Sequence, residues 1–297
     1  MRVIVAAPAK VNLWLRVGPP NEAGYHDLDT LFCGLDLADT VTLSTDHGDP
    51  DTVLELRHAE PLEALPDLGP PDENLAVRAA RAFGERTGLD VRPRIELVKR
   101  IPAGGGLGGG SSDAAAVLRA LNRLYPRALS PDALMELARG LGSDVPFFAA
   151  SRPLARGAGR GDRLRVLPAL PPRPVVLLMP ELAIPTPAAY RWVDEERAGR
   201  TVADVDPEPA GDGPPTWEDV VGRAANDFEP AIFGRYPVLE EMHAALRDHG
   251  ARPALLAGSG SSIFGVFDDT HVAAAAAGAV RARWPGLRIV RTATRAR

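Results

Sequence analysis

The chain has 297 residues, of which 45% are hydrophobic and 25% charged, and its formal net charge at pH 7 is −5. This composition is typical of a globular protein with about two domains. The single cysteine, Cys33, excludes an internal disulfide framework and a four-cysteine zinc site. Since the chain has no basic run, no long apolar run and no signal-peptide pattern at its N-terminus, we expect a cytoplasmic protein that binds neither nucleic acid nor membranes.

The first hundred residues are predicted to be rich in strands. Val11–Val17 places Val11, Leu13, Leu15 and Val17 on one inward face. A turn follows at Pro19, Pro20, Asn21 and Gly24. Other strands are predicted at Arg2–Ala6, Asp27–Leu37, Thr40–Leu43, Val53–Arg57 and Arg94–Val98.

Three helices are predicted between residues 74 and 142. Asn74 caps a helix that runs to about Thr87, and Ser130-Pro131 supplies an N-cap followed by a proline at the first helical position. The third runs from about Ser111 to Leu124.

The second half of the chain begins with a proline-rich stretch. Later elements are predicted as strands at Val175–Met179, Ala254–Leu256 and Ile263–Phe267, and as helices at about Pro237–His249 and His271–Trp284. Residues 204–215 are acidic and rich in proline and glycine, which is typical of a surface loop or linker. The order of strands and helices predicts an α+β fold with two domains, 1–156 and 157–297.

Lysine is scarce in this chain. Of the 34 basic residues only Lys10 and Lys99 are lysine, and the others are arginine. A lysine that remains in such a chain is a candidate for a position that needs a compact point charge.

A glycine-rich loop is the most informative motif. Six of the seven residues from 104 to 110 are glycine, between the strand at Arg94–Val98 and the helix that begins near Ser111. Glycine lets backbone N–H groups approach a ligand, and a helix N-terminus favours an anion. We expect the loop to bind a polyphosphate.

Two common phosphate loops do not match this motif. The pattern GxxxxGK[ST] is absent. Gly104, Gly106 and Gly109 satisfy GxGxxG, but the only acid at the spacing of a dinucleotide fold is Asp132, in the first turn of a predicted helix. These observations argue against a dinucleotide-dependent oxidoreductase.

The sequence PAGGGLGGGSSDA resembles the ATP loop of the superfamily of galactokinase, homoserine kinase, mevalonate kinase and phosphomevalonate kinase. Within that superfamily, the segments APAKVNL, GYHDL and GSDVPFF resemble motifs of the 4-diphosphocytidyl-2-C-methyl-D-erythritol kinases, as do IPTPAAY, NDFE and GSGSS later in the chain. The matches extend from residue 7 to about residue 265.

The resemblance implies a two-domain α+β fold with ATP and substrate in a cleft between the domains. It implies ATP-dependent phosphorylation of the 2-hydroxyl of 4-diphosphocytidyl-2-C-methyl-D-erythritol, a step toward isoprenoid precursors that does not use mevalonate. Asp144 would accept the hydroxyl proton, and Lys10 would hold Asp144 ionised and offset phosphoryl charge. The cofactor is ATP, with Mg²⁺ expected alongside it. The metal ligands are not identified, although Ser111 is a candidate.

The resemblance also assigns binding residues. The ATP loop comprises Pro102, Ala103, Gly104, Gly105, Gly106, Leu107, Gly108, Gly109, Gly110, Ser111 and Ser112. The substrate, which carries a cytidine diphosphate group, would contact Asn12, Tyr25, His26, Thr186 and Tyr190. Tyr25 offers a ring face to cytosine, His26 offers ring nitrogens to its edge, and Tyr190 could close the other side.

Three questions stay open at the level of sequence. Gly258-Ser259-Gly260 fits either a tight hairpin turn or a segment that contacts the glycine loop or the substrate phosphates. Residues 149–162 depart from the family pattern, which leaves the geometry of that loop open. The nearest alternative is another small-molecule kinase of the superfamily, and more distant ones are a dinucleotide-dependent oxidoreductase and a non-catalytic nucleotide-binding module; protein partners are not indicated.

Overall fold

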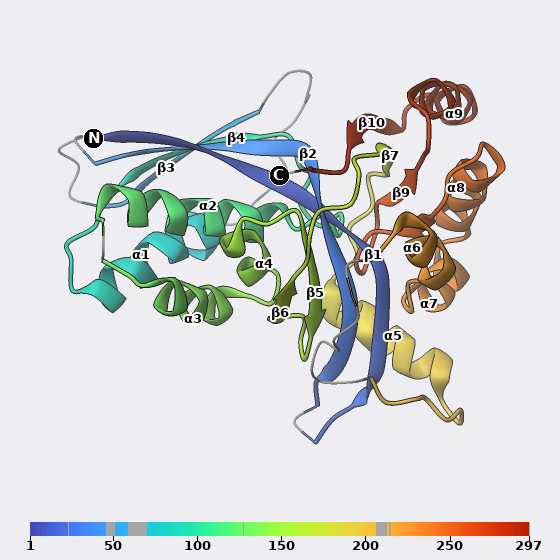
Figure 1. Cartoon of the computed structure of the whole chain (residues 1–297), viewed down its shortest axis with the longest axis horizontal. Helices are drawn as coiled ribbons and strands as arrows, with labels where there is room; N and C mark the ends of the chain where they lie inside the picture. The colour runs from blue at the N-terminus through green and yellow to red at the C-terminus, as the bar shows by residue number, and fades with distance from the viewer. Residues whose placement is uncertain are drawn as a thin grey trace. The chain divides into compact units, whose positions relative to one another are not determined.

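In the computed structural model, residues 1–22, 24–45, 51–58, 70–126, 128–205, 213 and 215–296 are described. The chain forms two compact units (Figure 1). Unit 1 contains Met1–Ala9, Leu37–Ala103 and Gly108–Ser151, and unit 2 contains Lys10–Asp36, Gly104–Leu107 and Arg152–Arg297. The predicted boundary between residues 156 and 157 stays a prediction, and most of the predicted linker 204–215 lies outside the described residues.

Two long strands open the chain. The elements in order are β1 (Arg2–Pro20), β2 (His26–Ser44), β3 (Val53–His58), η1 (Pro71–Glu73), α1 (Leu75–Thr87), β4 (Arg94–Lys99), α2 (Gly109–Leu124), α3 (Pro131–Leu141), α4 (Val145–Ala150), β5 (Leu154–Ala158), β6 (Arg163–Val166), β7 (Pro174–Met179), α5 (Thr186–Arg197), α6 (Trp217–Arg223), α7 (Glu229–Arg235), α8 (Pro237–Asp248), β8 (Ala254–Leu256), β9 (Ile263–Val266), α9 (Thr270–Arg283) and β10 (Arg288–Ala293). β1 is one continuous strand where two shorter ones were predicted, at Arg2–Ala6 and Val11–Val17. Pro8 does not interrupt it, because the fixed φ of proline suits an extended chain and the strand loses only one N–H donor there. The α+β class is confirmed.

Unit 1 combines a small sheet with helices. β4 lies between β3, which is parallel to it, and residues 40–44 of β2, which are antiparallel. Figure 1 shows α1, α2, α3 and α4 on one side of these strands. The side chain of Asn74 accepts from the Ala76 N–H, and Ser130 accepts from the Ala133 N–H, so both predicted helix caps are confirmed.

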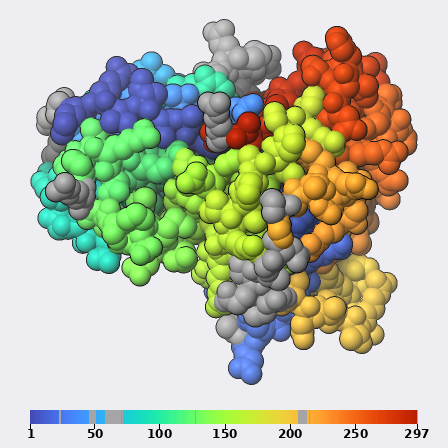
Figure 2. Space-filling view, viewed as in Figure 1, coloured from blue at the N-terminus to red at the C-terminus, as the bar shows by residue number. Residues whose placement is uncertain are grey.

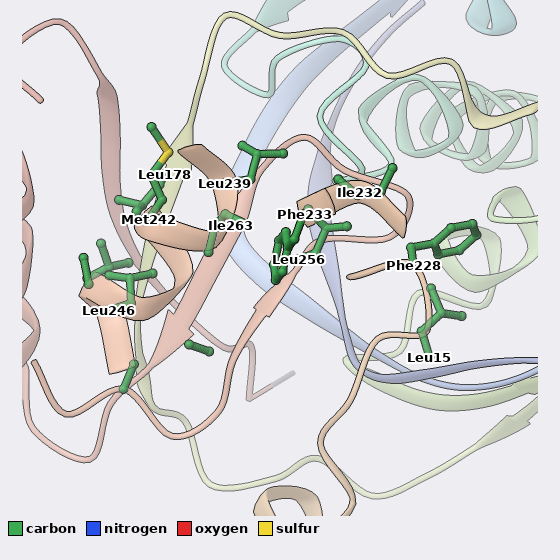
Figure 3. Packing of buried hydrophobic residues seen from close by; sticks show 14 of the residues in the cluster. Leu15, Leu178, Phe228, Ile232, Phe233, Leu239, Met242, Leu246, Leu256 and Ile263 are labelled. Atoms are coloured by element: carbon green, nitrogen blue, oxygen red, sulfur yellow. The ribbon is translucent and has the colours of Figure 1, made fainter. Parts of the chain in front are cut away.

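Unit 2 contains two groups of antiparallel strands. Residues 30–33 of β2 pair with β5, which pairs with β6, and a second sheet has the order β10-β7-β9-β8. A cluster of buried residues from this sheet and from α5, α7, α8 and α9 forms the core (Figure 3). Leu15 and Val17 of β1 belong to the same cluster, so this core holds the strand that carries Lys10. The inward positions predicted for Val11–Val17 are confirmed.

Helix α5 lies alongside the lower end of the β1–β2 hairpin, where its yellow atoms border blue ones (Figure 2). The Arg197 guanidinium donates to the Val17 carbonyl at 2.7 Å. Among the described residues, no helix is long and apolar enough to cross a membrane.

Candidate functional site

Lys10 lies in the interior of unit 2. Its side chain is only 4% exposed, and its Nζ donates to Asn12 Oδ1 at 2.9 Å and lies 5.6 Å from the centre of the Phe32 ring. Asn12 is two residues along β1, on the same face, as the strand period requires. The ammonium is therefore held by the side chain predicted to share its face.

A chain of hydrogen bonds fixes Asn12 in turn. Its Nδ2 donates to Thr30 Oγ1 at 2.7 Å, and that hydroxyl donates to the Trp14 carbonyl at 2.8 Å. Thr30 is 1% exposed. Its hydroxyl can donate only one proton, so the bond to Trp14 leaves it as an acceptor and sets the orientation of the Asn12 amide. Sequence reasoning missed Thr30, whose only signal is a polar residue on the buried face of β2.

The middle of the glycine loop packs beside Lys10. The Lys10 N–H donates to the Leu107 carbonyl at 3.0 Å. Gly106 has φ +75, and a Cβ added to it would lie 1.8 Å from the Ala257 carbonyl oxygen. At this position glycine is required both by the backbone conformation and by close packing.

The turn that joins β8 and β9 meets the same loop. The Ser262 N–H donates to the Gly105 carbonyl at 3.3 Å, and a Cβ on Gly258 would lie 3.4 Å from Lys10 Nζ. The two alternatives for Gly258-Ser259-Gly260 are therefore both correct, since this is a hairpin turn that also contacts the glycine loop. Thr186 Oγ1 lies 3.1 Å from Ser259 Oγ, so the turn also joins the start of α5.

In unit 1 the loop leads into the N-terminus of α2. The cap residue Gly108 has φ 72 and makes no side-chain cap bond. Ser111 is half-buried, whereas Ser112 is fully buried and its Oγ has no hydrogen-bond partner among the described residues. The first N–H groups of a helix lack partners within it, so this end of α2 is suited to an anion.

Lys99 forms a buried ion cluster beneath this helix end. Its Nζ donates to Asp113 at 2.6 Å and to Asp39, and Asp39 also accepts from the backbone N–H groups of Arg100 and Ile101. Burial lowers the pKa of Lys99, but the two carboxylates outweigh burial and raise that pKa above its usual value. One ammonium faces two carboxyls, and burial raises the pKa of Asp113 to about 7. The cluster connects the end of β4 to α2, so the contacts of Lys99 indicate a structural role.

Asp144 also belongs to unit 1. It is half-buried and precedes α4, and its side chain makes no cap bond to that helix. The Val145 N–H donates instead to the Gly142 carbonyl at 3.2 Å. The carboxylate is thus not used to cap the helix that follows it.

Among the predicted substrate residues of unit 2, His26 and Tyr190 contact each other, whereas Tyr25 contacts Arg160. His26 is buried, its Nδ1 lies 2.8 Å from the Gly18 carbonyl oxygen, and its ring stacks on Tyr190 at 5.0 Å. Because a carbonyl only accepts, Nδ1 carries a proton and the Nε2 edge faces Asp194 at 3.4 Å. Tyr25 is 55% exposed, and the Arg160 guanidinium lies 5.3 Å from its ring centre.

The segment that departs from the family pattern forms a hairpin. β5 and β6 are joined by a turn in which Gly159 and Gly161 both have positive φ, and the Leu28 N–H donates to the Gly159 carbonyl at 2.7 Å. This turn places Arg160 over Tyr25. Sequence reasoning noted the unusual segment but did not identify Arg160.

Two family models match the chain. The model described as "GHMP kinases N terminal domain" matches residues 74–152, and the model described as "GHMP kinases C terminal" matches residues 217–286. The first range contains the glycine loop and Asp144, and the second contains Asn226 and the β8–β9 turn.

Individual relatives cover nearly the whole chain. The 4-diphosphocytidyl-2-C-methyl-D-erythritol kinase of Anaeromyxobacter dehalogenans (strain 2CP-C) is 44% identical, over 96% of this chain and 87% of the relative. The kinase of the same name from Thermus thermophilus is 42% identical, over 94% of each chain.

Solved structures agree with these relatives. A crystal structure of 4-(cytidine 5'-diphospho)-2C-methyl-D-erythritol kinase is 39% identical with a TM-score of 0.73, and covers 98% of this chain and 99% of that one. An L. major mevalonate kinase, 14% identical with a TM-score of 0.68 over 99% of this chain and 97% of that one, shares the fold. The chain therefore belongs to the GHMP kinases, and within them to the 4-diphosphocytidyl-2-C-methyl-D-erythritol kinases.

Proposed function

We propose that the chain transfers the γ-phosphoryl group of ATP to the 2-hydroxyl of 4-diphosphocytidyl-2-C-methyl-D-erythritol. The identity of 42–44% to kinases of that name, over nearly the whole chain, carries this proposal. The backbone hydrogen bond from Lys10 to Leu107 supports it, because it places this buried lysine beside a loop suited to phosphate. The cytoplasmic location expected from the sequence stays a prediction.

Asp144 and Lys10 are the proposed catalytic residues. The substrate oxygen forms a bond to the γ-phosphorus while the bond from that phosphorus to the β,γ-bridging oxygen breaks and ADP leaves. Asp144 accepts the hydroxyl proton during this step. Lys10 supplies a fixed positive charge against the charge that builds on the transferred group.

The glycine loop, Pro102 to Ser112, is the proposed ATP site. Positive φ at Gly104, Gly106 and Gly108 turns backbone N–H groups in directions that residues with a Cβ rarely adopt. We expect Mg²⁺ to arrive bound to the phosphates of ATP. Within the described ranges there is no group of three or more His, Cys, Asp or Glu side chains that could hold a metal ion.

The residues proposed to bind the acceptor substrate are Asn12, Tyr25, His26, Thr186 and Tyr190, of which Tyr25, His26 and Tyr190 would contact its cytosine ring. Tyr25 has the exposed ring face that stacking on cytosine requires. His26 and Tyr190 stack on each other, so we infer that Tyr190 holds the imidazole in place for the edge of the base. Thr186, through Ser259, extends this surface toward the β8–β9 turn.

Arg160→Ala tests the contact between the guanidinium and Tyr25. An exposed cation–π contact is worth about 0.5–1 kcal/mol. We therefore expect KM for the cytidyl substrate to rise about twofold to fivefold, with KM for ATP unchanged. Arg163→Ala, at an exposed arginine of the same hairpin, should leave both constants unchanged. A fall in KM for the cytidyl substrate would instead show that Arg160 blocks the ring.

Thr30→Val tests the hydrogen-bond chain that ends at Lys10. Valine has a similar shape but no hydroxyl, so the buried Asn12 amide loses the acceptor that orients it. An unsatisfied buried polar group costs about 1–3 kcal/mol. We expect kcat to fall about tenfold, whereas Thr30→Ser, which keeps the hydroxyl, should stay near the parent value. Steady-state kinetics on the two variants measure the difference, and equal values would contradict the role given to Thr30.

Acceptor selectivity distinguishes this function from that of other kinases in the superfamily. The chain should phosphorylate 4-diphosphocytidyl-2-C-methyl-D-erythritol and leave homoserine and mevalonate unphosphorylated at the same concentration of ATP. Cytidine diphosphate should inhibit by competing with the acceptor. Phosphorylation of homoserine or mevalonate at a comparable rate would overturn the proposed substrate.

A further inference from the structure

Asn226 lies just before α7, in the NDFE segment, and none of the proposed functions above uses it. It is 3% exposed. Its Nδ2 donates to the Leu256 carbonyl at 2.8 Å and to the Gly258 carbonyl at 2.7 Å, while its Oδ1 accepts from the Phe228 N–H at 3.0 Å. One amide group thereby satisfies two carbonyls on either side of the point where β8 ends.

Glu229, three residues later, holds the same strand end. Its Oε1 accepts from the Leu256 N–H at 2.8 Å. Asn226 and Glu229 therefore bind both the N–H and the carbonyl of Leu256, and Asn226 adds the carbonyl of Gly258. Together they fix where β8 stops and in which direction the turn leaves it.

The turn held in this way contacts both the glycine loop and Lys10. Ala257 and Gly258 approach Gly106 so closely that neither Gly106 nor Gly258 has ordinary room for a Cβ next to the other segment. The position at Gly258 where a Cβ would lie is 3.4 Å from Lys10 Nζ. A shift of the turn by a fraction of an ångström would therefore displace the loop and change the surroundings of the ammonium.

We propose that Asn226, with Glu229, is a positioning residue for phosphoryl transfer: it locks the β8–β9 turn in the place that holds Gly105–Gly106 and Lys10. This rests on the proposed catalytic role of Lys10. Asn226 itself touches neither ATP nor the acceptor in this proposal. Its effect is on geometry, and a small misplacement of reacting groups can cost about a hundredfold in rate.

The two lysines of the chain provide a direct readout. With ¹³Cε-labelled lysine, NMR should show one signal from Lys10 and one from Lys99. Asn226→Asp has the same shape but cannot donate to the two carbonyls. We expect the Lys10 signal to move, the Lys99 signal to stay, and kcat to fall about 10- to 100-fold with KM for the cytidyl substrate within about twofold of the parent.

A second variant separates lost donors from added charge. Asn226→Ala removes the donors without adding a carboxylate and should move the Lys10 signal as well. The matched control is Asp227→Asn, at the next residue, whose side chain accepts from the Val17 N–H and from the guanidinium groups of Arg16 and Arg197, all of which lie outside the turn. This control should leave both lysine signals and kcat near the parent values.

Two variants of Glu229 provide a milder test, because they leave Asn226 intact. Burial raises the pKa of Glu229 to about 7, so glutamine is a close match to its neutral form. Glu229→Gln keeps an acceptor for the Leu256 N–H and should leave the Lys10 signal in place, whereas Glu229→Ala should move it. This comparison decides the question even if neither Asn226 variant folds.

The results separate the two proposals. An unchanged Lys10 signal in Asn226→Ala, or in Glu229→Ala if the former does not fold, would overturn the positioning role and leave the kinase function standing. An inactive parent chain would overturn the proposed function, and the NMR comparison would still show whether Asn226 and Glu229 position the turn beside Lys10. A moved signal with unchanged kcat would show that the turn is held but that its position does not matter for transfer, which also overturns the proposal.

Discussion

Asp144→Asn is expected to fold as the parent chain does and to lose about 10²–10⁴-fold of kcat, the usual effect of removing a positioned general base. The amide has the same shape as the carboxylate but cannot accept the hydroxyl proton. Since the side chain makes no cap bond to α4, the substitution removes no helix cap. The measurement is steady-state turnover together with a thermal melt that verifies the fold.

Asp132→Asn is the matched control for this change. Asp132 is an exposed carboxylate in the first turn of α3, also in unit 1. Its replacement alters charge near a helix N-terminus, an effect of about 0.3–1 kcal/mol on stability, and should not affect turnover. If Asp144→Asn kept kcat within about twofold of the parent, the role assigned to Asp144 would fail.

Lys10→Arg is expected to be nearly as damaging as Asp144→Asn, although it keeps the positive charge. Lys10 is almost fully buried between Asn12, Phe32 and the β8–β9 turn, so a longer, planar guanidinium has no room to place its charge where the ammonium stood. We expect a loss of at least about a hundredfold in kcat, as for a displaced reacting group. Steady-state kinetics at saturating concentrations of both substrates measure it.

An exchange in the opposite direction is the control. Arg81→Lys, on the exposed face of α1, should leave turnover and stability near the parent values, because a surface ion pair such as that with Asp72 contributes about 0–1 kcal/mol. Full turnover of Lys10→Arg would mean that any cation suffices at position 10.

Local signals accounted for much of the fold. Asn74 and Ser130 lie at helix starts as predicted, because a side-chain cap is set by a few neighbouring residues. β8 lies at Ala254–Leu256 as predicted, and the strand Arg94–Val98 was one residue short of β4. The shared face of Lys10 and Asn12 followed from strand parity alone and is confirmed.

Other features depend on contacts between residues far apart in sequence. Eight elements were not predicted: η1, α4, β5, β6, α5, α6, α7 and β10. Several of these are short, so their periodicity was too weak to distinguish them from loops. In α3, Leu134, Leu137 and Leu141 recur at a helical spacing, which is typical of a buried apolar face, but they are only half-buried, and the buried residue of that helix is Ala138.

In the candidate site too, local motifs could be read from the sequence, whereas contacts between distant residues could not. The glycine loop and Lys10 could be proposed as site residues from the sequence, because the motif is local and lysine is scarce, and their roles stay predictions. Thr30 is 18 residues from Asn12, and Asn226 is 32 residues from Gly258, so no spacing rule connects either pair. The roles proposed for Thr30 and Asn226 could be inferred only from the fold, which places a polar side chain of one segment against the backbone or amide of another.

The most direct test of the central claim is a measurement of ADP released from ATP, with and without 4-diphosphocytidyl-2-C-methyl-D-erythritol. The proposed mechanism predicts one ADP for each molecule of acceptor phosphorylated at its 2-hydroxyl, and little ADP when the acceptor is absent. Equal release of ADP in the two reactions, or release without phosphorylated acceptor, would contradict the proposal that this chain transfers phosphoryl to that hydroxyl.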